Sequence, residues 1–504
     1  MATRIGTFAC RTFQRDTKAS KRANLCHAQR LTNKQDPMKK LRPLTLTTIA
    51  FLVYLTACGQ LISKRESAAI DNILTESSGQ FKPKTYIIQN VSILTMKDSE
   101  LIENQSVLIE NGTIQEIGSD IQNQNATIID GTGKFLMPGL TDMHVHLFDR
   151  HPLKNTWMML LLINGVTSVR DMCGEPGEPG KLQLRDKIRR NEILAPNLYQ
   201  SGPIINGVKD NSGLFAYASS PEQGREIVIG QKKLGYDFIK VYDGLTKEVY
   251  KAISDEAQKQ GMLVNGHLPD KITLEDAIKS KHNSVEHLTG YFEWKDNQVS
   301  ISAPDNYASL TANSELWNCP TIYNHYMQGS RKGVAEMFSY AETSGLIPSD
   351  WTEMWKKRIS NNSKETMEIV DKFGQSNFET LKKIILNLYN SKAKLIAGTD
   401  AGNLPLLIPG YSLHQELRIM NEIGIPTYEV LKMTTINAAL AMNKETEFGT
   451  VEVGKRADLL LLNSNPLDKI ENLQDKNGLM VRGIWLSDEE IKKMTDKVKL
   501  AFGK

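Results

Sequence analysis

Short strand-like runs alternate with helical stretches along residues 138–402, and this alternation leaves few folds open to the chain. The runs are rich in apolar residues and are bounded by Gly, Pro, Asn or Asp, as strands of a buried parallel sheet are. They lie at 139–148, 165–172, 196–204, 236–244, 262–269, 284–288, 318–324 and 393–402. Eight strand–helix units over roughly 250–300 residues predict a (β/α)8 TIM barrel. The expected fold class is therefore α/β.

Two regions of different character flank the predicted barrel, which we place at 138–445. Residues 85–137 and 446–487 contain short strand-like runs, and Asn111-Gly112 between two of them is a strong hairpin signal. We expect these two segments to form one small β-sandwich, and residues 488–504 to form a closing amphipathic helix. The helical stretch 333–391 is predicted to be an insertion between the last two barrel strands.

A targeting signal is predicted ahead of these regions. Residues 38–58 read MKKLRPLTLTTIAFLVYLTAC, which has a basic start, a short apolar core and a small-residue end. The core is too short and too rich in threonine for a membrane-spanning helix. Because Leu-Thr-Ala-Cys resembles a bacterial lipobox, we interpret 38–57 as a lipoprotein signal peptide. Cys58 is then the lipid-modified residue, and 58–84 form a polar tether.

This signal predicts a lipid-anchored protein of the bacterial cell envelope that faces the periplasm. A plain signal peptide, which would release a soluble periplasmic or secreted protein, is the alternative. Residues 1–37 contain eight Lys or Arg and two Asp without apolar periodicity. We interpret them as an extension from a misassigned start codon and leave them out of the fold.

Composition gives a few further limits. The net charge of +3 is small for 504 residues, so nothing global favours nucleic-acid binding. Only two of the five cysteines, Cys173 and Cys319, belong to the predicted folded part. Two cysteines make neither a disulfide framework nor a zinc–cysteine site, and either a single disulfide or two buried thiols is open. A homo-oligomer is also left open.

Polar side chains stand where five of the eight runs end, although the chain has only nine histidines. These residues are His144, His146, Lys240, His267, His287 and Asp400. His144 and His146 are two apart, so they point to the same face of a strand. The carboxyl ends of barrel strands meet at one face, where active sites lie. Each residue alone has a structural explanation, such as a core histidine, a surface lysine or a helix cap, but together they predict a metal site.

The motifs PGLTDMHVHL, FIKVYDG, NGHLP, VEHLTG, AGTDAG and GTVEVGKRADLLLL together resemble the amidohydrolase superfamily. Within it they are most similar to the imidazolonepropionase-related branch, which includes prolidase-like Xaa-Pro and Xaa-Arg dipeptidases. The resemblance covers residues 85–487. It implies that His144, His146 and Asp400 bind one divalent ion and that His267 and His287 bind a second.

Lys240 has a special role in this resemblance, which implies that its amine is carboxylated and bridges the two ions. A lysine cation would be repelled by two dications, whereas a carbamate is an anion that can bridge them. Two divalent ions, of which zinc is the expected one, share a hydroxide and lower its pKa toward neutrality. Asp400 can hold one ion and also move the proton of the hydroxide to a leaving amine.

Four further residues are expected to contact the substrate: Tyr242, Tyr323, Arg170 and His325. Tyr242 lies two residues beyond Lys240, on the same face of the strand. Tyr323 and His325 follow the seventh run, where the prolidase-like branch has a tyrosine that contacts its substrate. Arg170 ends the second run and either binds a substrate carboxylate or forms an internal salt bridge. We expect His151, His282 and His414 to be structural.

The sequence therefore predicts a metal-dependent hydrolase that cleaves an amide-type bond, most plausibly in a dipeptide or an N-acyl amino acid. Attack by a metal-bridging hydroxide is the expected mechanism. Lys240 argues against the single-metal deaminases of the same superfamily, which generally lack this bridging residue. A cyclic-amide hydrolase and a catalytically inactive, solute-binding lipoprotein are the alternatives. The expected partners are a small-molecule substrate and, through the lipid anchor, a membrane, but no nucleic acid.

Overall fold

The computed structural model describes residues 82–147, 154–174, 180–209, 214–361, 364–402 and 407–502. The predicted signal peptide, Cys58 and His151 lie outside these ranges. Within them, every helix is too short or too polar to cross a bilayer. Cys173 and Cys319 are both buried thiols and do not form a disulfide with each other, so the two-thiol alternative is the one observed.

Eight parallel strands, one from each predicted run, form the centre of the fold. They are β6 (Leu140–Val145), β7 (Val166–Asp171), β8 (Asn197–Gln200), β11 (Phe238–Val241), β12 (Leu263–Gly266), β13 (Ser284–Glu286), β16 (Trp317–Cys319) and β17 (Lys394–Leu395). One sheet contains β6-β7-β8, and the other runs from β11 to β17 with β9 (Ile204–Asn206) and β10 (Phe215–Tyr217) at its edge. Parallel bridges Ser201–Phe238 and Val145–Ala401 join the two sheets at both ends. The predicted barrel is confirmed, with each strand inside or overlapping its predicted run.

Helices follow most of these strands, as the alternation predicted. They are α3 (Lys154–Ile163), α4 (Gly180–Arg189), α5 (Pro221–Leu234), α6 (Lys247–Lys259), α7 (Leu274–Lys279), α8 (Tyr307–Ala312), α13 (Tyr411–Glu422), α14 (Thr427–Met433) and α15 (Ile436–Ala441). The sequence of α6 shows why such a segment is helical. Thr246 caps its first turn by accepting from the Val249 amide, and Val249, Ile253 and Ala257 recur at four-residue intervals on its buried face.

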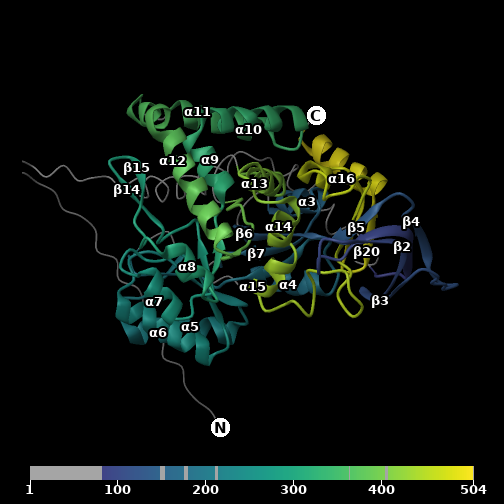
Figure 1. Ribbon diagram of the computed structural model, residues 1–504, viewed down its shortest axis with the longest axis horizontal. Helices are drawn as coiled ribbons and strands as arrows, with labels where there is room; N and C mark the ends of the chain where they lie inside the picture. Colours follow the sequence, from purple (N-terminus) through teal and green to yellow (C-terminus); the bar gives the residue numbers. More distant parts are fainter. Residues whose placement is uncertain are drawn as a thin grey trace, which may run out of the picture. The chain divides into compact units, whose positions relative to one another are not determined.

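Four helices lie between β16 and β17; the last three coincide with the predicted insertion at 333–391, and the first precedes it. They are α9 (Ile322–Gly329), α10 (Arg331–Ser344), α11 (Ser349–Ser360) and α12 (Lys364–Asn390), which gather at the top of Figure 1. The seventh run was expected to stay extended to residue 324, but its strand ends at Cys319 and α9 begins at Ile322. Thr321 is in the left-handed region with φ 48°, which turns the chain out of the sheet.

A hairpin of β14 (Phe292–Lys295) and β15 (Gln298–Ile301) follows β13, and β15 packs against α12. Its turn residues, Asp296 and Asn297, both have positive φ, as a tight two-residue hairpin turn requires. The sequence analysis did not predict this hairpin.

A separate sheet combines the first and last parts of the described chain. Its strands are β1 (Tyr86–Leu94), β2 (Leu101–Glu110), β3 (Thr113–Gly118), β4 (Thr127–Asp130), β5 (Phe135–Pro138), β18 (Leu459–Leu462), β19 (Lys476–Val481) and β20 (Ile484–Ser487). Their order is β20-β19-β18-β5-β1-β2-β3, with β4 beside β1. Asn111 and Gly112 form the predicted hairpin turn with φ 51° and 80°. The segments before and after the barrel thus share one small β-structure, as predicted, with a hydrophobic core of its own.

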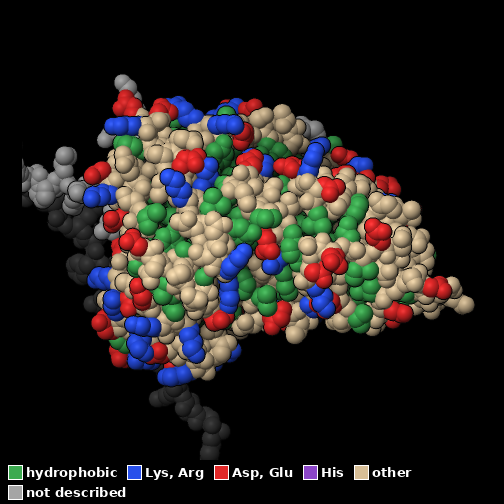
Figure 2. Space-filling view, viewed as in Figure 1, with side chains coloured by type: hydrophobic (Ala, Val, Ile, Leu, Met, Phe, Trp, Pro, Cys, Tyr) green, Lys and Arg blue, Asp and Glu red, His purple; other side chains and the backbone are tan. Residues whose placement is uncertain are grey.

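The short 3-10 helix η1 (Ile470–Gln474) lies between β18 and β19, and the helix α16 (Asp488–Ala501) follows β20. Ser487 and Glu490 form a reciprocal capping box at the start of α16. Figure 2 shows basic and acidic side chains mixed over the visible face. Pairs such as Lys251–Asp255 and Lys356–Glu342 illustrate this mixing, which agrees with the small net charge.

Candidate active site

The first group of predicted ligands meets at the carboxyl ends of β6 and β17. Asp400 Oδ1 lies 2.9 Å from His146 Nε2 and 3.3 Å from His144 Nε2. The two imidazole Nε2 atoms are themselves 3.3 Å apart. Asp400 is placed by its own backbone, with φ 63° and an amide that donates to the His144 carbonyl at 2.7 Å. Two imidazole nitrogens and one carboxylate oxygen therefore converge on one point, where the sequence analysis expected the first ion.

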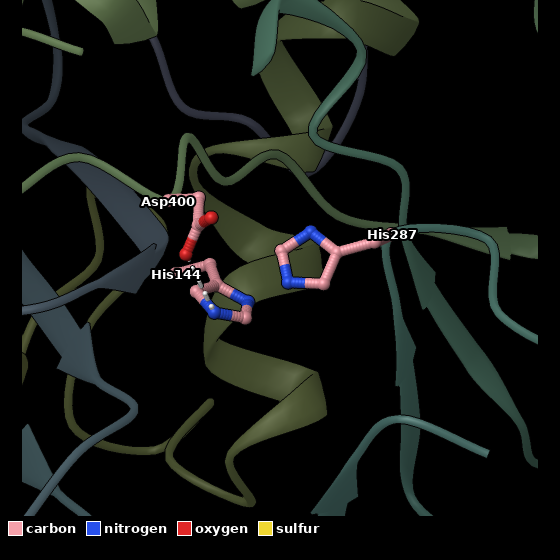
Figure 3. Close-up of side chains that lie close together, drawn as sticks. All are labelled: His144, His287 and Asp400. Carbon is pink, nitrogen blue, oxygen red and sulfur yellow. Dashed lines mark ion pairs between the residues drawn. The ribbon is translucent and has the colours of Figure 1, made fainter. Parts of the chain in front are cut away.

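The predicted ligands of the second ion lie next to this point. The ring of His287 is 4.5 Å from the ring of His144, and the ring of His267 is 5.0 Å from that of His287. Figure 3 shows the His287 ring directed toward His144 and Asp400. Ligand atoms of these three residues all lie within 4.8 Å of one another, which is close enough for metal binding.

Lys240 extends from β11 into the same region and is 1% exposed. It pairs with Asn265 of β12, and a Cβ atom on the neighbouring Gly266 would lie 3.1 Å from its Cδ. Burial lowers the pKa of Lys240 from its ordinary value, while the charges of Glu286 and Asp400 act in the opposite direction. A buried amine with a lowered pKa has a larger neutral fraction, which is the form that reacts with carbon dioxide.

The hydrogen bonds of the histidines test whether this site fits metal ions. His144 Nδ1 donates to Glu286 Oε2 at 2.7 Å, so the lone pair of this imidazole lies on Nε2. That lone pair points at His146 Nε2 and Asp400 Oδ1, which belong to the other two predicted ligands of the first ion. His267 Nδ1 similarly lies 3.4 Å from Asp243 Oδ1, which leaves its Nε2 as a ligand atom. Nitrogen and oxygen lone pairs that face one another at these distances are stabilised by a cation between them. A carboxylate that accepts a hydrogen bond from the other ring nitrogen is typical of metal-binding histidines.

Burial also keeps these rings neutral. Desolvation, with the nearby charge of Lys240 as a smaller cause, holds the pKa of His144 well below its ordinary value. Desolvation likewise holds the pKa of His287 well below its ordinary value. Neutral imidazole is the form that binds a metal ion.

Arg170 lies beneath this cluster and forms an internal salt bridge. Its Nη2 donates to Glu286 Oε1 at 2.7 Å, its Nε to the Met143 carbonyl at 2.6 Å, and its Nη1 to Ser284 Oγ at 2.8 Å. The residue is 1% exposed. The structure therefore favours the internal salt bridge over the substrate contact, because the guanidinium is buried and committed to protein acceptors.

The other three expected substrate contacts differ in position. The Tyr242 ring lies 4.1 Å from the His267 ring, and His325 Nε2 lies 3.3 Å from the His287 carbonyl oxygen. Burial lowers the pKa of His325 to about 4. Tyr323 is 1% exposed and packs beside Tyr326 and Tyr411. Tyr242 and His325 thus adjoin the candidate metal centre, while Tyr323 belongs to an aromatic cluster of the core.

The histidines expected to be structural have internal partners where they are described. His282 lies 3.0 Å from the Tyr250 hydroxyl and 2.8 Å from the Ser284 carbonyl. His414 Nε2 lies 2.9 Å from the Asn164 carbonyl. Burial lowers the pKa of His282 to about 4 and that of His414 to about 3.

Several residues that hold the site were missed by the sequence analysis. They are Glu286, Thr321, Asn324, Asp243 and Glu416. Glu286 could have been found, because an acidic residue in the short apolar run 284–288 needs a buried partner. Asn324 has no such signal, because nothing in its spacing indicates that its amide donates to Asp400 Oδ2 at 2.9 Å.

The profile of the amidohydrolase family matches residues 135–486. An ochratoxinase from Aspergillus niger is 23% identical over 459 residues, which cover 78% of this chain and 84% of that protein. A 5'-deoxyadenosine deaminase from Methanobrevibacter smithii is 24% identical over 420 residues, covering 76% and 84%. A solved Xaa-Pro dipeptidase has a similar fold, with a TM-score of 0.61 and 20% identity over 80% of this chain and 100% of that one.

Proposed function

The chain belongs to the amidohydrolase family, as its motifs predicted, and from this premise we propose that it is a binuclear metal-dependent amide hydrolase. Family membership makes the chain a hydrolytic enzyme. The number and kind of the ions, the modified lysine and the substrate are parts of the proposal. The proposed ions are two zinc ions bridged by carboxylated Lys240. The proposed substrate is a dipeptide or an N-acyl amino acid.

One observation supports this proposal most strongly. The imidazole and carboxylate ligand atoms of His144, His146 and Asp400 face one another within 3.3 Å. Acceptor atoms brought this close in a buried site repel one another unless a cation lies between them. The donor set of neutral imidazoles and one carboxylate suits zinc.

Different residues of the chain have different roles in the proposed hydrolysis. When bound, two divalent ions supply a nucleophile from water at neutral pH and polarise the amide carbonyl. His144, His146, Asp400, His267 and His287 would hold the ions. Asp400 would hold an ion through Oδ1, which faces His144 and His146, while its Oδ2, which accepts a hydrogen bond from Asn324, is the oxygen that can move a proton toward the departing amine.

The choice of an amide substrate has two supports. A solved Xaa-Pro dipeptidase, a dipeptide-cleaving enzyme by name, shares the fold. Lys240 favours a two-ion site over the one-ion site of related deaminases. A deaminase nevertheless stands among the similar sequences, so deamination belongs in the same test, together with cyclic amides. An inactive solute-binding protein is the remaining alternative.

Metal analysis combined with a substrate panel tests the proposal. We expect two zinc ions per chain after expression with zinc and bicarbonate, loss of activity on chelation, and recovery on addition of zinc. The panel contains dipeptides, N-acyl amino acids, cyclic amides and 5'-deoxyadenosine. Hydrolysis of the first two classes supports the proposal, ammonia release from the nucleoside contradicts it, and a fully active metal-free chain would contradict the metal site itself.

We also propose attachment to the cell envelope through Cys58, since residues 38–58 have the features of a lipoprotein signal. Cys58→Ala should leave the precursor uncleaved or release the protein from the membrane fraction. Fractionation followed by mass measurement of the amino terminus checks this. A processed Cys58→Ala chain that stays in the membrane fraction would exclude a lipid at this residue.

A further inference from the structure

Residues 321–325, at the start of α9, contact the candidate metal centre at three points. Thr321 Oγ1 lies 2.7 Å from His287 Nδ1. Asn324 Nδ2 donates to Asp400 Oδ2 at 2.9 Å. His325 Nε2 lies 3.3 Å from the His287 carbonyl oxygen. This short segment therefore touches a predicted ligand of each ion, His287 and Asp400.

The backbone of this segment needs support from outside. Thr321 has φ 48° and ψ 47°, a conformation that β-branched residues rarely adopt. Its side chain does not cap α9, because its hydroxyl lies against His287 instead. The first amide groups of a helix have no partners within the helix and need acceptors elsewhere.

Glu416 of α13 supplies these acceptors. Its Oε1 accepts from the Ile322 amide at 3.0 Å, and its Oε2 accepts from the Tyr323 amide at 2.7 Å. Glu416 is 0% exposed. Both oxygens of this buried side chain are bound to backbone amides that have no partner within the helix, so the contact fixes both the place and the direction of the helix start. One side chain therefore fixes the position of residues 321–325 from a helix more than ninety residues away in sequence.

We propose that Glu416 is a positioning residue for the metal centre. It fixes the start of α9, and Thr321 and Asn324 in turn orient His287 and Asp400. Because these two ligands belong to different ions, a single carboxylate sets the coordination geometry of both. The inference rests on the proposed function, since it needs a metal centre to position.

Cobalt substitution of the full chain tests this role, because the absorption spectrum of Co²⁺ reports coordination geometry directly. Glu416→Ala removes both acceptors, and Glu416→Gln keeps one oxygen but places an amide donor against the other N–H group. We expect both variants to change the visible spectrum and to lose Co²⁺ to a chelator at least about 10-fold faster than the unmodified chain. On a hydrolysed substrate, kcat should fall about 10-fold or more while KM changes less than about 2-fold.

Two variants separate positioning from general loss of stability. Glu422→Gln removes an exposed carboxylate from the same helix, where it pairs with Arg418. Val498→Ala truncates a fully buried side chain in α16. Both should keep the spectrum and the rate of Co²⁺ loss, although Val498→Ala lowers the melting temperature.

A double-mutant cycle keeps the test decisive when Glu416→Ala yields little folded protein. Asn324→Ala combined with Glu416→Gln should accelerate Co²⁺ loss by less than the product of the two single effects, since both act through one segment. Multiplicative effects, or a Glu416→Gln chain with an unchanged spectrum and rate, would overturn the positioning role and leave the proposed function standing. An unmodified chain that binds no Co²⁺ would overturn both.

Discussion

Lys240 is the residue whose chemical state decides the electrostatics of the site. As a buried ammonium ion it would be repelled by two nearby dications, whereas its carbamate is negative and offers two ligand oxygens. We expect Lys240→Ala to lose at least one ion and to lower turnover at least about 100-fold, which corresponds to about 2.7 kcal/mol. Acetate or formate should restore part of the activity. Metal analysis and turnover with and without added acid measure this.

The arginine variant separates a bridging lysine from a lysine that only fills space. Lys240→Arg should be inactive and should not respond to added acids, because its guanidinium stays cationic and occupies the same volume. Lys251→Ala, at an exposed lysine of α6, serves as the control and should behave like the unmodified chain. A Lys240→Arg chain with two ions and near-normal turnover would remove Lys240 from the bridge.

Glu286 joins His144, a proposed metal ligand, to the buried cation Arg170 through its two carboxylate oxygens. Glu286→Gln should weaken metal binding about 10–100-fold, since the ring of His144 loses its acceptor. It should also destabilise the fold by about 3–5 kcal/mol, because Arg170 becomes an uncompensated buried charge. Metal titration and chemical denaturation measure the two effects separately.

The double variant Glu286→Gln with Arg170→Met distinguishes these two roles. Without the buried cation, most of the lost stability should return, whereas metal affinity should stay low. If metal affinity recovers together with stability, Glu286 only balances the charge of Arg170 and does not orient His144.

The sequence could predict the ligand cluster because each ligand ends a strand, and strand ends meet in a barrel. The structure brings His144, His146, His287 and Asp400 together for that reason. The groups that hold the ligands could not be predicted in this way. Glu286 meets His144 from 142 residues away, and its contact depends on side-chain geometry inside the barrel and not on periodicity.

At the scale of elements, α9 is the point where the strand pattern was wrong. The apolar run continues to residue 324, yet Pro320 cannot donate a ladder hydrogen bond and Thr321 turns into the left-handed region. The helix that begins there depends on Glu416, a distant acceptor. The eight barrel strands were predictable because the apolar residues that each strand buries are contiguous in its own run. The start of α9 was not predictable in this way, because it depends on a contact with Glu416, which is distant in sequence.

The packing of α9 against α12 yields an element-scale prediction. The two helices approach closely at Gly329 and Gly374, where a Cβ atom on Gly374 would collide with the Gly329 carbonyl oxygen. Gly374→Ala should therefore force the helices apart, destabilise the protein by about 1–3 kcal/mol and lower turnover, since α9 positions Asn324. Thermal unfolding and a turnover assay measure these effects.

Gly230 in α5 provides a matched control, because a Cβ atom there meets nothing within 4 Å. Gly230→Ala should leave turnover unchanged and stabilise the protein by about 0.4–1 kcal/mol, since alanine restricts the unfolded chain. Equal behaviour of the two variants would mean that the contact between α9 and α12 does not position the site.

At the scale of the whole molecule, the barrel and the small sheet are joined through Asp458. Its carboxylate accepts from Arg456 Nε at 2.6 Å, from the Arg482 amide at 2.7 Å and from Asn197 Nδ2 of β8 at 2.9 Å. In addition, β18 pairs antiparallel with β5, which leads directly into β6. The sequence predicted this sharing of segments, since strand-like runs flank both sides of the barrel, but not the polar junction between them.

The stability of the whole chain should depend on pH through its buried structural histidines. Burial lowers the pKa of His414 to about 3, whereas an unfolded histidine titrates near 6.5. Below about pH 6.5 the unfolded chain therefore binds a proton that the folded chain does not. The free energy of unfolding is therefore highest above that pH and falls as the pH falls toward 3, by about 1.4 kcal/mol per pH unit for each such residue.

His414→Gln keeps a donor for the Asn164 carbonyl and removes this titration, so the stability of this variant should fall less steeply between pH 6.5 and 4. Denaturant titrations at several pH values on metal-depleted chains compare the two slopes, and parallel slopes would show that His414 is protonated in the folded state.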